Sequence, residues 1–204
     1  MDGDAAAGVK RMSAATIRIE PATADRLDDV SAIFADCSYG RKCWCAYWYS
    51  PNREFKANWG EGNRPVLADR VRAGREPGVI AYVDDLPAGW LGIAPRTEFD
   101  RLNRSRPFAT VDGDTIDPAS IWAMNCFIVV KAHRRQGLMR ALILGGLDHI
   151  RARGGKIAEA YPFDARRKPL ADELFVGTAA AFRDCGFVEA ARRLPGRPIM
   201  RRAL

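Results

Sequence analysis

The sequence lacks the features that mark several common classes of protein. No apolar run among its 204 residues is long enough to span a membrane, and residues 1–16 lack the apolar core of a signal peptide. It contains neither a Gly-x-x-x-x-Gly-Lys-Ser/Thr motif nor the glycine fingerprint of a dinucleotide site. Its five cysteines are an odd number. We therefore expect a cytoplasmic chain with reduced thiols, without a P-loop or a Rossmann nucleotide site.

The composition is typical of a globular domain. The chain is 48% hydrophobic and 28% charged, and it is long enough to bury a full core. Residues 1–15, rich in alanine, glycine and aspartate, are expected to form a flexible leader, and residues 16–204 a single domain. The net charge of +7 would allow an acidic partner such as nucleic acid. Because the arginines are spread along the chain in short clusters, charge alone does not indicate nucleic-acid binding.

The most informative stretch covers residues 120–155. Residues 121–130 are apolar or nearly so except for Asn125, as in a strand covered on both faces. After a basic turn, apolar residues recur every three or four positions from Leu138 to Ile150, and the pair Gly154-Gly155 follows. The pattern predicts a buried strand, a short turn and a helix.

The turn has the properties of an anion site. Gly137 stands where the helix opens, so the N–H groups of residues 136–140 can point outward at a bound phosphate. Arg134, Arg135 and Arg140 and the positive end of the helix would assist. A solvated basic helix start would contain the same residues, so that alternative stays open.

Patterns elsewhere predict the remaining elements. We expect a strand over residues 16–20, helices over 23–35 and 63–74, and a hairpin over 78–83 and 88–94. A polar loop over 96–120 is expected near the substrate mouth. After the central unit we expect a strand over 156–161, a helix over 173–185 and a terminal hairpin over 187–192 and 197–202.

At the turn the chain resembles the GCN5-related N-acetyltransferase superfamily. The acetyl-CoA motif of that family is a hydrophobic strand, then Arg or Gln, two residues, Gly, one residue, and Gly or Ala. It is matched here by Arg134 and Gly137, with Met139 at the last position and Lys131 where a proline is common. The order of elements also resembles the family from Thr16 onward, and the most similar members that we identify are bacterial. The resemblance implies an α/β (α+β) fold with a mixed, mostly antiparallel sheet of six to seven strands and about four helices.

The resemblance further implies an acyltransferase that moves the acetyl group of acetyl-CoA to a primary amine by direct attack on the thioester. Backbone amides of the turn would hold the pyrophosphate, and the strand around residues 127–129 would pair with the pantetheine arm. The implied cofactor-binding residues are Phe127, Ile128, Val129, Arg134, Arg135, Gln136, Gly137, Leu138, Met139 and Arg140. The acceptor would be a small-molecule or peptide amine, and a homodimer is compatible with the sequence. A non-catalytic acyl-CoA-binding sensor and a basic nucleic-acid-binding module remain as alternatives.

Residues 37–59 form an unusual segment with three cysteines and several aromatic residues. Cys37, Cys43 and Cys45 have no nearby histidine or second cysteine pair, whereas structural zinc takes four ligands, so no metal is expected. The segment could form a satellite core, because buried thiols pack as small hydrophobes. We favour a second interpretation from the resemblance, in which it covers the acceptor pocket. The substrate-binding candidates are then Trp44, Tyr47, Trp48 and Asn125.

The central strand contains no acidic residue that could act as the general base, so the catalytic candidates come from its neighbour. Glu159 lies in the apolar strand beside it, and burial raises the pKa of a carboxyl group toward that of a useful base. A paired structural carboxylate is the equal alternative. Phe182 stands where the family commonly has a tyrosine acid, so Tyr161, solvent or no acid at all would assist the departing thiolate. Cys126 lacks an evident activating partner for an acyl-enzyme route, and a backbone N–H near Phe127 or Ile128 could stabilise the oxyanion.

Overall fold

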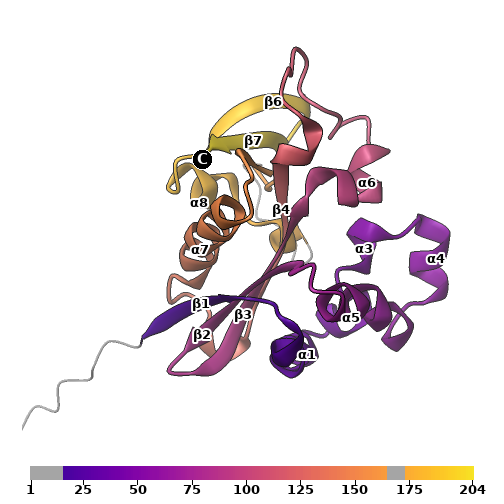
Figure 1. The fold of residues 1–204 in the computed structure, drawn as a ribbon, viewed down its shortest axis with the longest axis vertical. Coiled ribbons are helices and arrows are strands. Elements are labelled where there is room, and N and C mark those ends of the chain that lie inside the picture. The colour runs from indigo at the N-terminus through magenta and orange to yellow at the C-terminus, as the bar shows by residue number, and fades with distance from the viewer. Residues whose placement is uncertain (1–15, 165–172) are drawn as a thin grey trace, which may run out of the picture.

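A seven-stranded sheet forms the centre of the molecule (Figure 1). The computed structural model describes residues 16–164 and 173–204, and the leader predicted over residues 1–15 lies outside them. The strands are β1 (Ile17–Pro21), β2 (Gly78–Val83), β3 (Leu86–Pro95), β4 (Ile121–Val129), β5 (Ile157–Ala160), β6 (Val188–Leu194) and β7 (Arg197–Ala203). Their order in space is β1-β2-β3-β4-β5-β7-β6, and only the β4–β5 pair is parallel. The predicted mixed, mostly antiparallel sheet is confirmed.

The described residues contain eight α-helical segments, twice the predicted number. Three have nine or more residues, namely α1 (Leu27–Asp36), α5 (Arg64–Arg72) and α7 (Leu138–Ala152). The others have four to six, namely α2 (Gly40–Cys43), α3 (Ala46–Tyr49), α4 (Asn52–Ala57), α6 (Asp100–Asn103) and α8 (Ala179–Arg183). Single turns of this length carry too little periodicity to be read from a sequence.

The helix predicted over residues 173–185 is wrong as a continuous element. It is divided into the 3-10 turn η6 (Glu173–Val176) and α8, separated by Gly177. Gly177 has φ 73°, which is incompatible with a right-handed helix, and Thr178 then caps α8 through the amide of Ala181.

Each face of the sheet carries its own core. Alternate residues of β2 divide between the faces, so that Val79 and Ala81 pack with α7 while Ile80 and Tyr82 pack with α1. Figure 1 shows α7 and α8 on one side of the sheet and α1, α3, α4 and α5 on the other. No helix in the described ranges is long and apolar enough to cross a lipid bilayer.

A β-bulge in β4 changes which side chains face which core. Gly92 pairs with Cys126 and the next residue, Ile93, pairs with Met124, so Asn125 is the extra residue of the bulge. Met124 packs on the α7 side, whereas Cys126, two residues later, packs on the α1 side. The parallel pairing with β5 ends at the same point, because the last partner pair is Met124 and Ala160. The second half of β4 thus continues past the end of β5.

Candidate active site

The turn before α7 has the backbone geometry of an anion site. Gly137 caps the helix with φ 81° and Arg135 has φ 62°, so both occupy the left-handed region. Within the described residues, the first amide after this turn that donates to a backbone carbonyl is that of Ala141, which donates to Gly137 at 3.2 Å. The N–H groups before it are available to a ligand at the positive end of a 15-residue helix.

A groove of about 770 Å³ runs from this turn along β4. Eight of the ten implied cofactor-binding residues line it, namely Phe127, Ile128, Val129, Arg134, Arg135, Gly137, Leu138 and Met139. The side chain of Gln136 instead folds back, with Nε2 donating to the carbonyl of Ala132 at 3.1 Å, and Arg140 is not among the lining residues. Of the residues that the structure describes, four with basic or imidazole side chains and a single acid, Asp36, line the groove.

A smaller cavity of about 290 Å³ lies beside the groove, on the α1 side of β4. Three of the four residues predicted to bind the acceptor line it, namely Tyr47, Trp48 and Asn125. Trp44 is not among its lining residues. Its ring stacks on Phe34 with centroids 5.0 Å apart and planes 1° apart, and the guanidinium carbon of Arg64 on α5 lies 5.4 Å from the centroid of the Trp44 ring. Trp44 is therefore part of a satellite core, as the first interpretation of residues 37–59 predicted.

The groove and the cavity meet at three shared side chains. Tyr39, Ile128 and Phe175 line both spaces, and the rings of Tyr39 and Phe175 stack with centroids 5.4 Å apart. The sequence analysis did not identify Tyr39 as a site residue, although Tyr39 lies in the segment of residues 37–59 that was predicted to cover the acceptor pocket. It also missed Phe175 and Phe108, which come from segments after β5 and before β4 and carry no periodic signal. Phe108 does lie in the polar loop that was predicted near the substrate mouth.

Glu159 and Tyr161 belong to a buried ion-pair cluster outside both spaces. The Glu159 carboxylate is completely buried and accepts hydrogen bonds from Arg96 Nε at 3.0 Å, from Arg201 Nε at 2.6 Å and from the Tyr161 hydroxyl. Arg201 also donates from both terminal nitrogens to Asp114, at 2.6 and 2.7 Å. Burial, and then the charge of Glu159, raise the pKa of Tyr161 well above its usual value. This geometry favours the alternative in which Glu159 is a structural carboxylate.

The five cysteines are free and buried. A hydrogen bond with Cys45, followed by burial, raises the pKa of Cys126 well above its ordinary value, and burial raises that of Cys43 to about 12. Both thiols therefore stay protonated at neutral pH, which removes the thiolate that an acyl-enzyme needs. No group of three or more His, Cys, Asp or Glu side chains within residues 16–164 and 173–204 is arranged to hold a metal ion.

Known proteins share this architecture. The model of the acetyltransferase (GNAT) family matches residues 44–173, more than half of the chain. The chain therefore belongs to the GNAT acetyltransferase family, and it is an acyltransferase. None of the curated protein sequences is significantly similar to it.

Several solved structures have the same fold at low sequence identity. The PaiA N-acetyltransferase of Thermoplasma acidophilum, in complex with coenzyme A, is 11% identical with a TM-score of 0.52, over 93% of this chain and 99% of its own. The yncA protein of Salmonella typhimurium, with its cofactor acetyl-CoA, is 15% identical with a TM-score of 0.50, over 92% and 94%. A ribosomal-protein-alanine N-acetyltransferase from Brucella melitensis is 17% identical with a TM-score of 0.51, over 92% and 99%.

Proposed function

We propose that this protein transfers the acetyl group of acetyl-CoA to a primary amine by direct attack of the amine on the thioester. The observation that carries the proposal is the junction at Ile128, where a basic groove beginning at a helix N-terminus opens into an aromatic cavity. A long cofactor and a separate acceptor could meet there. Bound in the groove, acetyl-CoA would supply an activated acetyl group, and the chain's own residues would orient it.

The residues of the groove fit a CoA pyrophosphate and pantetheine arm. Gly137 lines the groove, and a Cβ built on it would meet no atom within 4 Å, so the missing side chain leaves the backbone open to a ligand. Arg134 and Arg135 would add positive charge. The second half of β4, which continues past the end of β5, offers its edge to the pantetheine amides. An N–H near Phe127 or Ile128 would stabilise the oxyanion.

Proton transfer in this cavity does not depend on a carboxylate. Among the described residues that line the small cavity there is no aspartate, glutamate or histidine. The amine attacks in its neutral, nucleophilic form. We assign removal of the remaining proton to water. The Tyr39 phenol, at the junction of groove and cavity, is the group that we propose to protonate the departing thiolate.

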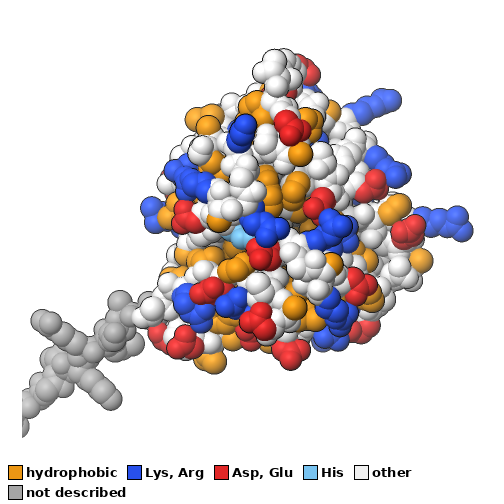
Figure 2. Space-filling model, in the orientation of Figure 1, with side chains coloured by type: hydrophobic (Ala, Val, Ile, Leu, Met, Phe, Trp, Pro, Cys, Tyr) orange, Lys and Arg blue, Asp and Glu red, His pale blue; other side chains and the backbone are white. Residues whose placement is uncertain are grey.

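The basic C-terminal region gives little support to the nucleic-acid alternative. Arg192 pairs with Asp164 at 2.5 Å, Arg193 pairs with Asp112 at 3.1 Å, and Arg201 is held by Glu159 and Asp114. Figure 2 shows basic side chains interspersed with acidic ones over the visible face, rather than gathered in one patch. A duplex-binding surface would present a continuous basic area.

The direct test is product formation across a panel of amines. The protein is incubated with acetyl-CoA and amino acids, amino-terminal peptides, aromatic amines and polyamines, and N-acetylated products are identified by mass spectrometry. We expect at least one class to be acetylated in an enzyme-dependent reaction. If acetyl-CoA binds and no class is acetylated, the acyl-CoA sensor replaces this proposal.

A further inference from the structure

The wall of the small cavity is mostly aromatic, and this narrows the class of acceptor, a step that rests on the proposed transferase function. Six aromatic side chains of the described residues line it, namely Phe34, Tyr39, Tyr47, Trp48, Phe108 and Phe175. The cavity volume, about 290 Å³, is at the lower end of the range for small-molecule sites. An apolar body that enters it leaves water for an apolar surrounding, which is favourable. The cavity therefore suits a small acceptor with an apolar body.

The thiols of this wall add no charge to it. Cys43, Cys45 and Cys126 line the cavity and are buried. Burial raises the pKa of Cys43 to about 12, and the hydrogen bond with Cys45 raises that of Cys126 well above its ordinary value. Cys43 and Cys126 therefore stay neutral near pH 7, and a buried neutral thiol packs as a small hydrophobe. They offer no negative charge to a cation.

The amide and guanidinium groups of the wall provide no negative charge either. Asn125 is neutral, its side chain is 2% exposed, and its Nδ2 atom is buried. Arg197 donates from Nε and Nη2 to the carbonyl of Tyr161, at 3.2 and 3.0 Å. No aspartate or glutamate stands among the described residues that line the cavity. A second ammonium group on the acceptor would therefore lose its hydration without gaining a counter-charge, which is costly.

Aromatic rings can also hold a cation on their faces, but two rings of this wall already have cationic partners. The guanidinium carbon of Arg101 lies 3.8 Å from the centroid of the Tyr47 ring. That of Arg197 lies 5.2 Å from the centroid of the Phe108 ring. The rings thus enclose an apolar space and do not form a cage for a further cation.

The position of the cavity sets the direction of the acceptor. At one end the cavity meets the basic groove at the Ile128 junction. At the other it shares Tyr47, Trp48 and Phe108 with an outer hollow of about 430 Å³. An acceptor that enters from this hollow with its amine first would present the amine to the junction and leave its body among the rings.

We propose that the acceptor is a small primary monoamine whose body is uncharged and apolar, as in an alkylamine or an aralkylamine. The amine faces the Ile128 junction and the aromatic rings enclose the body. Diamines and polyamines are poor acceptors, because their second ammonium group would be buried without a counter-charge.

Two acceptors of equal size test this proposal. Hexylamine and 1,5-diaminopentane have the same number of non-hydrogen atoms, and the second replaces a terminal methyl group by an ammonium group. We expect kcat/KM near pH 7 to be roughly 100-fold or more higher for hexylamine, because the ammonium group must be buried or deprotonated. An equal or higher value for the diamine, or product only with other classes of the wider panel, would overturn the acceptor class and leave the transferase function intact. Absence of product with every amine would overturn the function itself.

Two variants assign the discrimination to the cavity. Val176 of η6 lines it, so Val176→Asp places a carboxylate beside the acceptor body and should reduce the preference for hexylamine at least about 10-fold. Val188 on β6 is 67% exposed and does not line the cavity, so Val188→Asp adds the same charge and should keep the wild-type preference. The KM for acetyl-CoA and the melting temperature report whether the groove and the fold are intact. An unchanged preference in folded Val176→Asp would contradict the assignment, and the wild-type preference decides the acceptor class if this variant does not fold.

Discussion

Glu159 shows what a single residue's sequence context can and cannot reveal. An acid within an apolar strand indicates a buried carboxylate, and the structure places it with no exposed surface. Its partners come from residues 63 and 42 positions away, Arg96 and Arg201, which no local pattern connects to it. The sequence therefore predicted the burial of Glu159 but left its ion pairs undetermined.

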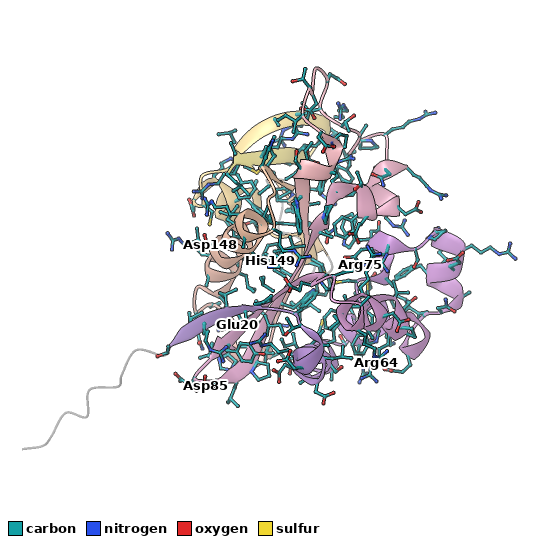
Figure 3. The ribbon with its side chains drawn as sticks, in the orientation of Figure 1. Glu20, Arg64, Arg75, Asp85, Asp148 and His149 are labelled. Carbon is teal, nitrogen blue, oxygen red and sulfur yellow. The ribbon has the colours of Figure 1, made fainter. Side chains whose placement is uncertain are left out.

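Replacing this carboxylate should affect stability far more than catalysis. Glu159→Gln removes the carboxylate that pairs with the buried Arg96 and leaves Arg201 with Asp114 alone, so the free energy of unfolding should fall by about 3 kcal/mol, while kcat near pH 7 stays close to that of the wild type. Glu20 is a matched control, because it also pairs with two arginines, Arg18 and Arg26, but on a partly exposed strand (Figure 3). Glu20→Gln should change stability by less than about 1 kcal/mol in urea unfolding. A large loss of kcat in a stable Glu159→Gln protein would restore Glu159 as the base.

Tyr39 is the residue to test as a proton donor. Tyr39→Phe removes the hydroxyl and keeps the ring that stacks on Phe175, so kcat should fall by about 10-fold with little change in the KM for acetyl-CoA. Tyr47→Phe, which alters a phenol of the cavity away from the groove, is the control and should retain most of the rate. Equal rates for Tyr39→Phe and the wild type would show that the thiolate leaves without this phenol.

His149 lies on α7 (Figure 3). We expect it to make the free energy of unfolding depend on pH at values above those at which carboxyl groups titrate. Burial lowers its pKa, the charge of Glu76 opposes this effect, and Arg153 adds to it. The unfolded chain therefore binds the proton more tightly, so stability is highest above the unfolded pKa of about 6.5 and declines as pH falls below it. Denaturant unfolding of the wild type should give lower stability at pH 5.5 than at pH 7.5. His149→Gln should reduce that difference, and an unchanged difference would exclude His149 as its source.

At the scale of elements, the strand, turn and helix of residues 121–152 could be predicted because each is specified locally. The β4 bulge could not, because it appears only when β4 is paired with β3, and it decides that Asn125 faces the cavity. The break at Gly177 was missed although its signals are local. A glycine that can take a left-handed φ is followed directly there by Thr178, an N-cap residue.

The role of the turn before α7 can be tested by substitution of Gly137. Gly137→Val forces a β-branched residue into φ 81° and places its side chain in the groove, so acetyl-CoA affinity should fall roughly 10-fold or more. Gly154, after the other end of α7, has φ 78° and equally open surroundings, so Gly154→Val imposes similar strain away from the groove. Calorimetry should find normal acetyl-CoA affinity in this control. Equal loss in both variants would mean that strain, and not the groove, determines binding.

For the whole molecule, the family and the fold could be predicted from the sequence, whereas the composition of the small cavity could not. The order of elements and the Arg134–Gly137 spacing are properties of continuous stretches. The small cavity is lined by residues from α1, residues 37–59, the loop before β4, β4 itself, η6 and β7. Its shape is therefore defined only when these segments fold together. This is why Trp44 was placed in the cavity and Arg197 was not.

Amine-dependent release of coenzyme A is the most direct test of direct acetyl transfer. Initial rates are measured with saturating acetyl-CoA, with and without the best acceptor of the panel. The amount of coenzyme A thiol released is compared with the amount of N-acetylated product. We predict that release depends on the amine, that thiol and product appear in equal amounts, and that acetyl-CoA alone leaves no acetyl group on the protein. Acetyl-CoA binding without amine-dependent release, or a covalent acetyl-enzyme that forms before the amine is added, would contradict this account.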